Sequence, residues 1–267
     1  MTHVIERRGQ VAAFFDLDGT LIPGPSLEQR LFRKLRHQRA IPAQNYFFWL
    51  AHAVRRMPLG IATIAHLNKM YLRGVSVASV SITEITEHQT AVLQPSSLQA
   101  GVPAIFPAAI ERVAWHVRQG HAIVLVSGTL ATLAREAALV LALRLALRGL
   151  TTSIAVCATQ LEEVHRRCTG RIAGEAIFAQ GKARAIWSLS NQARFDLARS
   201  FAYGDSANDR WMLGAVGRPA AVNPSKELER IARLLDWPVL RWNEARSEPR
   251  DASGSAAIAT AQQEILG

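Results

Sequence analysis

Short apolar runs of strand-forming residues alternate along this chain with longer segments whose apolar residues recur at helical spacing. The runs lie at residues 11–15, 122–126, 154–157, 201–203 and 220–222. The helical segments include residues 108–118, 130–147, 182–190 and 226–235. This alternation is typical of a parallel sheet wrapped by helices. The sequence therefore predicts an α/β fold with a doubly wound parallel-sheet core.

One interval breaks the alternation, because no apolar strand run occurs between Leu21 and about Gly101. Its patterns are helical, at residues 27–35, 46–55 and 61–72. Stretches that contain Pro or Gly, at residues 23–25 and 94–103, bound the interval as hinges would. We therefore expect a helical domain inserted after the first strand.

The predicted organisation has three parts. Residues 1–22 and 101–242 form the core, and residues 23–100 form the inserted helical domain. Residues 243–267 are rich in Ala, Ser, Glu and Gln and lack a strong apolar period. We expect this last segment to be a disordered tail.

The charge and cysteine content narrow the class of protein. With 31 Lys and Arg against 21 Asp and Glu, the formal net charge is +10, which favours an anionic ligand or surface without naming one. Two cysteines, Cys157 and Cys168, without Cys-x-x-Cys spacing indicate a reducing compartment. The first residues do not resemble a signal peptide, and no apolar stretch reaches the ~20 residues of a membrane helix. We expect a soluble, cytoplasmic protein.

Two carboxylates, Asp16 and Asp18, directly follow the first predicted strand. Residues i and i+2 of an extended chain point the same way, so both would face the carboxyl end of the sheet, where open α/β sheets bind ligands. At ~5 Å they would repel by roughly 3 kcal/mol, which favours a divalent cation or a shared proton. A calcium-binding loop is excluded, because Leu21 and Leu27 stand where it needs Gly and Glu. An acidic loop that caps a helix stays open as the alternative.

Two further junctions offer groups for an anion. Ser127-Gly128-Thr129 lies between a predicted strand and a helix, where a hydroxyl and backbone N–H groups bind anions, although Ser or Thr there is more often a helix cap. Lys182 starts another predicted helix, where its charge opposes the helix dipole. A Gly-x-x-x-x-Gly-Lys-Ser/Thr phosphate loop is excluded by Ala176 and Ala183. A solvated lysine is the alternative there.

The strand at 201–203 also ends in acidic residues. Four-residue spacing places Asp205 and Asp209 on one side of the following turn, with helix capping by Asp205 or Asn208 as the alternative. All four sites lie on the same predicted edge and together supply carboxylates for a cation, and a serine, a lysine and backbone amides for an anion. A metal ion with a phosphate is the simplest interpretation. One spare carboxylate then attacks phosphorus, and another transfers the proton of the leaving group.

These motifs resemble the haloacid dehalogenase superfamily and, within it, the phosphoserine-phosphatase-like branch. The resemblance covers roughly residues 11–242. It rests on four motifs in the family's order: Asp16-Leu-Asp-Gly-Thr-Leu21, Ser127-Gly128, Lys182 and Gly204-Asp-Ser-Ala-Asn-Asp209. It implies a Rossmann-like core in which the helical insertion is a cap domain.

The resemblance also implies roles for individual residues. Asp16 would be the nucleophile and Asp18 the general acid/base, with Lys182 as the third catalytic residue. Asp209 would position Lys182 or a metal-bound water. The metal would be Mg²⁺. Its ligands would be the acidic residues Asp16, Asp18, Asp205 and Asp209, of which Asp18 would bind through its backbone carbonyl. The phosphoryl group would be bound by Ser127, Gly128, Lys182 and Asn208.

Substrate choice would then depend on residues 23–100. Arg73 resembles the cap arginine that binds the carboxylate of phosphoserine. Phosphoserine phosphatases bind the substrate amine with a glutamate nine residues after the nucleophile, and Pro25 stands there in this chain. Glu28 is a substitute three residues further on. The difference disfavours phosphoserine itself as the substrate.

Two further features of the insertion have two interpretations each. A basic run would attract polyanions or an acidic membrane, although a solvated helix face is the favoured interpretation. It consists of Arg30, Arg33, Lys34, Arg36 and Arg39. The apolar run Tyr-Phe-Phe-Trp-Leu at 46–50 would meet a lipid tail, although packing within the domain's own core is favoured.

Three functions are weighed against one another. The leading hypothesis is a magnesium-dependent phosphomonoester hydrolase that acts on a small phosphorylated metabolite through an aspartyl-phosphate. The alternative is a phosphatase of an anionic lipid or lysophospholipid phosphate. A catalytically silent module that binds nucleic acid or membranes is disfavoured, because all four motif sites are present. Nucleic acid is not an expected partner, whereas peripheral membrane contact stays open.

Overall fold

The computed structural model describes residues 9–55, 57, 64, 67–82 and 104–242. Its centre is a six-stranded sheet in the order β3-β2-β1-β6-β7-β8, in which every neighbouring pair is parallel. The strands are β1 (Ala12–Phe15), β2 (Ala122–Leu130), β3 (Ile154–Thr159), β6 (Phe201–Gly204), β7 (Arg218–Val222) and β8 (Val239–Leu240). The predicted α/β parallel-sheet fold is confirmed, and the short edge strand β8 is added to the five predicted strands.

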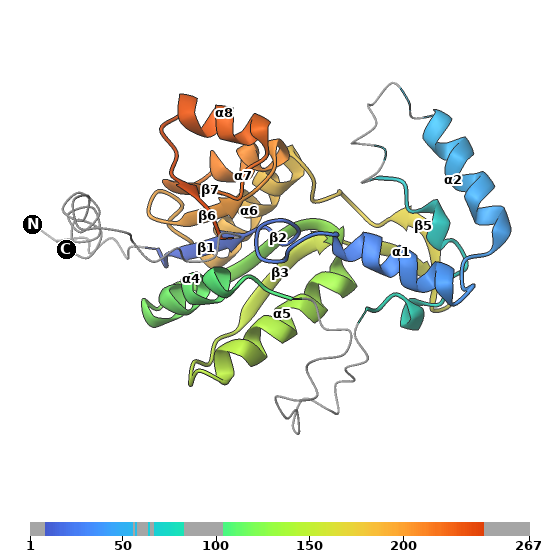
Figure 1. Cartoon of the computed structure of the whole chain (residues 1–267), viewed down its shortest axis with the longest axis horizontal. Helices are drawn as coiled ribbons and strands as arrows, with labels where there is room; N and C mark the ends of the chain where they lie inside the picture. The colour runs from blue at the N-terminus through green and yellow to red at the C-terminus, as the bar shows by residue number, and fades with distance from the viewer. Residues whose placement is uncertain (1–8, 56, 58–63, 65–66, 83–103, 243–267) are drawn as a thin grey trace, which may run out of the picture.

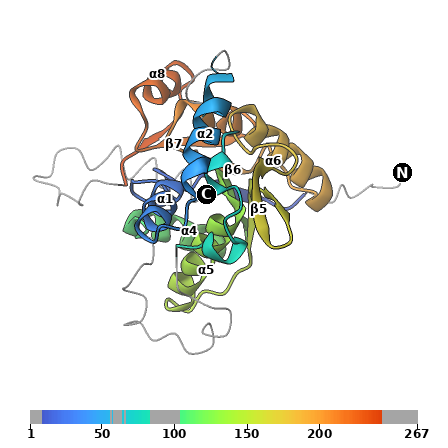
Figure 2. The same ribbon diagram turned by 90° about the vertical axis from the view of Figure 1, so that its right-hand side faces the viewer.

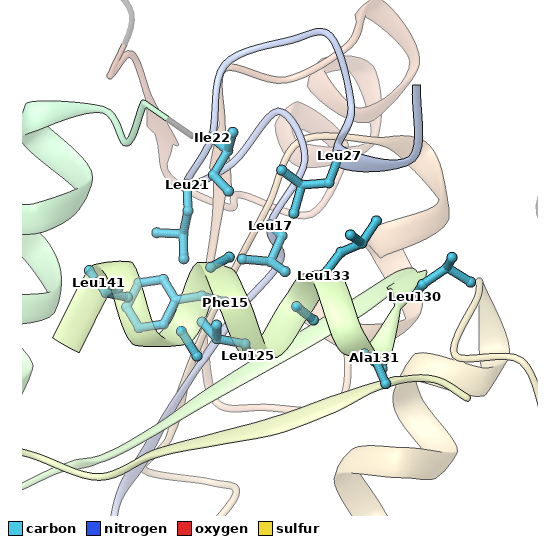
Figure 3. Packing of buried hydrophobic residues seen from close by; sticks show 14 of the residues in the cluster. Phe15, Leu17, Leu21, Ile22, Leu27, Leu125, Leu130, Ala131, Leu133 and Leu141 are labelled. Carbon is cyan, nitrogen blue, oxygen red and sulfur yellow. The ribbon is translucent and has the colours of Figure 1, made fainter. Parts of the chain in front are cut away.

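Helices cover both faces of this sheet (Figure 1). They are α4 (Pro107–Arg118) and α5 (Ala131–Ala146) on one face, and α6 (Gln180–Ala193), α7 (Arg210–Leu213) and α8 (Lys226–Leu234) on the other. Strand β1 is fully buried because its side chains alternate between the two layers: Ala13 and Phe15 pack with α4 and α5, and Ala12 and Phe14 with the other three helices. Figure 3 shows part of the hydrophobic cluster on the face covered by α4 and α5, where residues of β1, β2 and α5 pack with Leu21, Ile22 and Leu27.

The interval predicted as a helical insertion follows β1. It contains α1 (Leu27–His37), α2 (Ala43–Arg55) and the 3-10 turns η2 (Met70–Leu72) and η3 (Val77–Ser79). Figures 1 and 2 place α1 and α2 beyond the carboxyl ends of the strands. Helix α1 joins the main core through the i, i+4, i+8 face of Leu27, Leu31 and Leu35. Of the helix predicted at 61–72, residues 61–63, 65 and 66 lie outside the described residues; residues 68–69 are not helical, and residues 70–72 form the 3-10 turn η2 instead of an α-helix. The predicted hinge at 94–103 and the tail at 243–267 lie wholly outside the described residues.

A β-hairpin joins this insertion to the second half of the chain. Its antiparallel strands are β4 (Leu161–Val164) and β5 (Arg167–Ile172), which were not predicted because their residues form no apolar run. The backbone N–H of Gly74 donates to the carbonyl of Cys168 at 2.7 Å, and the N–H of Cys168 donates to the carbonyl of Val75 at 2.9 Å. The hairpin is therefore joined by backbone hydrogen bonds to the residues that follow η2.

The aromatic run at 46–50 does not pack as predicted. The inner side of α2 is set by Asn45, whose Nδ2 donates to the carbonyls of Tyr71 at 3.0 Å and Arg73 at 2.6 Å. The opposite side of the helix therefore faces outward, and the side chain of Phe47 is 70% exposed. The expectation of an aromatic core there is wrong, because buried backbone hydrogen bonds to Asn45 determine the orientation of the helix.

Within the described residues, none of the helices has the length and apolar character needed to cross a membrane.

Candidate active site

Asp16 stands at the carboxyl end of the central strand β1. Its backbone N–H donates to the carbonyl of Tyr203 at 2.9 Å, which continues the pairing of β1 with β6 by one residue. Its buried carboxylate accepts a hydrogen bond at Oδ1 from Nζ of Lys182 at 2.5 Å. Residues 166 positions apart in the chain are thus in direct contact, as the convergence of the four motifs predicted.

Lys182 is the third residue of α6 and is almost completely buried. Its Nζ donates to Asp209 Oδ1 at 2.5 Å as well as to Asp16. Burial alone would lower the pKa of Lys182, but the two carboxylates raise it above its ordinary value, so the ammonium group stays charged. The alternative of a solvated lysine is therefore excluded. Gly181 permits this placement, because a Cβ there would lie 2.3 Å from the carbonyl oxygen of Ala176.

Asp209 combines a capping role with the ion pair. It ends the short turn η6 (Ala207–Asp209), and its Oδ2 accepts hydrogen bonds from the N–H and the hydroxyl of Ser206, both at 2.9 Å, while Oδ1 binds Lys182. Gly204 lets the turn close, since a Cβ there would lie 2.5 Å from Cβ of Asp209. The capping alternative named Asp205 or Asn208, but the capping box is formed by Ser206 and Asp209, so the Asp209 side chain both closes the turn and pairs with Lys182.

Three carboxylates, of Asp16, Asp205 and Asp209, each offer one oxygen such that the three oxygens lie within 4.8 Å of one another. Burial, reinforced by the neighbouring carboxylates, raises the pKa of Asp16 to about 7 and that of Asp205 to about 8. A single lysine cannot neutralise three neighbouring carboxylates, of which those of Asp16 and Asp209 are buried and that of Asp205 is partly buried, and oxygen ligands of this kind suit a hard divalent cation. The residues present therefore fit Mg²⁺.

Thr20 and Gly19 were quoted in the first motif without roles of their own, and the structure assigns both to Asp205. The hydroxyl of Thr20, which is fully buried, donates to Asp205 Oδ1 at 3.3 Å. At Gly19 (φ +89°) a Cβ would lie 2.2 Å from Asp205 Oδ2. Only glycine fits a left-handed turn pressed this closely against a carboxylate.

Asp18 lies beside this cluster but not in an extended strand. Strand β1 ends at Phe15, and the chain then turns back, so the strand alternation that predicted a common direction for Asp16 and Asp18 does not apply. Asp18 Oδ1 accepts a hydrogen bond from the backbone N–H of Leu27, the first residue of α1, at 2.8 Å. Burial raises the pKa of Asp18 to about 6. Its carboxylate is not part of the three-carboxylate group.

Ser127 and Gly128 belong to the end of β2. The strand runs on to Leu130, with a register shift between Ser127 and Leu130, rather than ending before the serine as predicted. The N-cap of α5 is Leu130, without a side-chain hydrogen bond, so neither Ser127 nor Thr129 is that cap. Ser127 is buried, and its Oγ accepts a hydrogen bond from the N–H of Thr129 at 3.3 Å. The buried hydroxyl of Thr129 has no hydrogen-bond partner within the described part of the chain.

The remaining predicted residues are spread over the insertion and the turn. Asn208 lies half-buried in η6 next to Asp209. Glu28 Oε2 accepts a hydrogen bond at 2.5 Å from Lys69, a fully buried lysine that the sequence interpretation did not single out. Arg73 is exposed, with its guanidinium 4.7 Å from the centre of the Phe48 ring. The two predicted specificity residues are therefore both already engaged by neighbours.

A family model of haloacid dehalogenase-like hydrolases matches residues 13–214. This range contains Lys182 and the three carboxylates grouped near it, those of Asp16, Asp205 and Asp209. The chain belongs to this family and is an enzyme of its hydrolase class. The resemblance drawn from the four motifs is confirmed.

Individual relatives point to the expected branch. A phosphoserine phosphatase of Mycobacterium tuberculosis is 30% identical over 258 residues, which cover 92% of this chain and 75% of the relative. The structure of a protein of unknown function from Bordetella pertussis has a TM-score of 0.59 at 25% identity, over 88% of this chain and 99% of that one. A substrate-bound phosphoserine phosphatase complex shares the fold with a TM-score of 0.55 at 17% identity, over 98% of both chains.

Proposed function

We propose that the protein is a magnesium-dependent phosphomonoester hydrolase that acts on a small phosphorylated metabolite through an aspartyl-phosphate on Asp16. The observation that carries the proposal is the buried Asp16 carboxylate, held by Lys182 beside Asp205 and Asp209 at the carboxyl edge of the sheet. The two free thiols, Cys157 and Cys168, agree with a cytoplasmic site of action.

Asp16 supplies the nucleophile. Lys182 holds Oδ1 and thereby orients the carboxylate, and the other oxygen attacks phosphorus. A bond forms between that oxygen and phosphorus while the bond from phosphorus to the ester oxygen of the substrate breaks. In the second step a water oxygen attacks phosphorus, which releases inorganic phosphate and restores the Asp16 carboxylate.

Asp18 handles the proton in both steps. With a pKa of about 6 it is partly protonated near neutral pH, so it can give its proton to the leaving ester oxygen and later take one from the attacking water. The hydrogen bond from Leu27 N–H places this carboxyl group where the insertion meets the core.

Mg²⁺ would be held by the carboxylates of Asp16 and Asp205 and the backbone carbonyl of Asp18, and when bound it would neutralise charge on the phosphoryl oxygens. Asp209 keeps Lys182 in place through Oδ1. Lys182, Ser127, Gly128 and Asn208 bind the phosphoryl group, and the unpartnered hydroxyl of Thr129 offers one further donor at this edge.

Residues 23–100 act as a cap over this edge and, together with the β4–β5 hairpin, select the substrate. Glu28 Oε2 is paired with the buried Lys69, whose positive charge offsets that of the carboxylate, so a cationic amine gains less there even though Glu28 Oε1 has no hydrogen-bond partner within the described residues. A phosphorylated metabolite without an amine at that position is therefore favoured over phosphoserine. A lipid phosphate is the second candidate, because the exposed apolar side of α2 would contact the lipid surface that carries such a substrate.

The test is hydrolysis of a panel of phosphate esters, including phosphoserine and a lysophosphatidate, with Mg²⁺ and with EDTA, for the wild type and Asp16→Asn. We expect turnover that requires Mg²⁺ and is lost in Asp16→Asn, with phosphoserine a poor substrate. A folded protein that binds Mg²⁺ but hydrolyses none of the esters would overturn the proposal.

A further inference from the structure

The apolar side of α2 faces away from the rest of the protein. It consists of Tyr46, Phe47, Trp49, Leu50 and Val54, all exposed, and Phe47, Leu50 and Val54 are each more than half exposed. At 100° per residue Phe47, Leu50 and Val54 lie on the side opposite the buried Asn45 and Tyr46 lies beside them, whereas Trp49, one turn after Asn45, is at the edge of the exposed side. Figures 1 and 2 show α2 at the outer end of the molecule, beyond α1 and β5. An amphipathic helix whose apolar side is the exposed one indicates an external partner.

The charge of the surrounding segment indicates which partner. Residues 29–83 contain nine Lys and Arg and not one Asp or Glu, so this segment carries nine of the ten net positive charges of the chain. Some of the basic groups are used internally: Arg30 donates to backbone carbonyls of residues 23 and 25, Lys34 to that of Ser81, and Lys69 pairs with Glu28. Five others are exposed: Arg33, Arg36, Arg39, Arg55 and Arg73.

This combination argues against self-association. Two copies that met through α2 would bring together two positively charged segments. Charges that come within the Debye length of ~8 Å in physiological salt are not fully screened, so the two segments would repel each other. An apolar helix side rich in Phe, Trp and Leu, with Arg on the flanking surface, is instead the arrangement of helices that lie in the headgroup region of a membrane.

We propose that the outward side of α2, with the exposed arginines of residues 29–83, docks on the surface of a membrane that contains anionic lipids. Phe47, Leu50 and Val54 would enter the interface between headgroups and acyl chains, and the arginines would face lipid phosphates. The proposal is independent of the reaction at Asp16, because it concerns only where the protein resides.

The test is flotation of the full chain with vesicles of phosphatidylcholine, with or without phosphatidylglycerol. We expect binding only to the anionic vesicles, weakened by added salt, and weakened about tenfold or more in the double variant Phe47→Gln/Leu50→Gln. Leu147→Gln is the matched control, because Leu147 is 57% exposed at the end of α5 and Leu50 is 56% exposed. Thermal unfolding establishes that each variant is folded.

Equal binding to neutral and anionic vesicles would overturn the proposal, as would a double variant that binds like the wild type. A wild type that ignores both kinds of vesicle and is a dimer, converted to a monomer by the same double variant, would overturn it in favour of a second copy of the chain.

Discussion

Replacing Lys182 with methionine leaves the carboxylates of Asp16 and Asp209 facing each other without the ammonium group that now bridges them. At the 4.8 Å limit of the cluster, two such charges repel by about 3 kcal/mol at an effective dielectric constant of about 20. Removing one partner of a buried ion pair costs roughly 3–5 kcal/mol. We therefore expect the free energy of unfolding to fall by about 3–5 kcal/mol at pH 8 in EDTA, with a Tm decrease on the order of 10 °C.

The pH dependence distinguishes this cause from loss of packing. Burial already raises the pKa of Asp16 to about 7, and Lys182 opposes that rise. The folded variant therefore binds a proton at Asp16 more tightly than the unfolded chain, so its carboxylate repulsion is absent well below pH 7 and appears as the pH rises through the folded pKa. We expect a clearly smaller loss of stability at pH 5 than at pH 8.

Denaturant unfolding in EDTA at the two pH values measures this difference, with Lys226→Met, an exposed lysine on α8, as the control. A loss of the same size at both pH values would refute the electrostatic reasoning. So would a loss no larger than that of the control.

Three further predictions concern the same site. Asp18→Asn keeps a hydrogen-bond acceptor but removes the proton donor, so hydrolysis of alkyl phosphates should slow by about 10²–10⁴, and that of p-nitrophenyl phosphate, with its better leaving group, far less. Gly19→Ala should weaken Mg²⁺ binding, measured by calorimetry, because its Cβ would lie 2.2 Å from Asp205 Oδ2; Gly120→Ala, also at positive φ but in open space, should not. In EDTA the free energy of unfolding of the wild type should fall as the pH rises from 5 to 8, because the raised pKa values of Asp16 and Asp205 make the folded state bind protons more tightly than the unfolded chain. Mg²⁺ at 100 times its Kd should restore about 2.7 kcal/mol at pH 8 and much less at pH 5. A flat profile in EDTA would contradict the last prediction.

The meeting of Asp16, Lys182, Asp205 and Asp209 was predictable from the sequence. The strands β1 and β6 are recognisable in the sequence as apolar runs, and neighbouring parallel strands have their carboxyl ends at the same edge of the sheet. Once the runs were recognised, the acidic residues that follow them had to share one edge. The unfavourable place of Lys182 at a helix start indicated a role other than helix formation but not its burial, because a solvated lysine was the default interpretation of this residue alone.

Other features depend on contacts that no local pattern encodes. The β4–β5 hairpin has few buried residues, among them Cys168, and is held by backbone pairing with residues 74–77 of the insertion. The outward orientation of α2 follows from two hydrogen bonds of a single side chain, Asn45. The turn after Phe15, which moves Asp18 out of the strand direction and onto the start of α1, likewise results from packing of the insertion.

The central claim is that a phosphoryl group becomes attached to Asp16 during turnover. The direct measurement is an acid quench of the wild type while it hydrolyses a radiolabelled phosphate ester with Mg²⁺, followed by peptide mapping. We predict label on the peptide that contains Asp16, released by hydroxylamine and absent from Asp16→Asn. Label on another residue, or undiminished turnover by Asp16→Asn, would contradict the account.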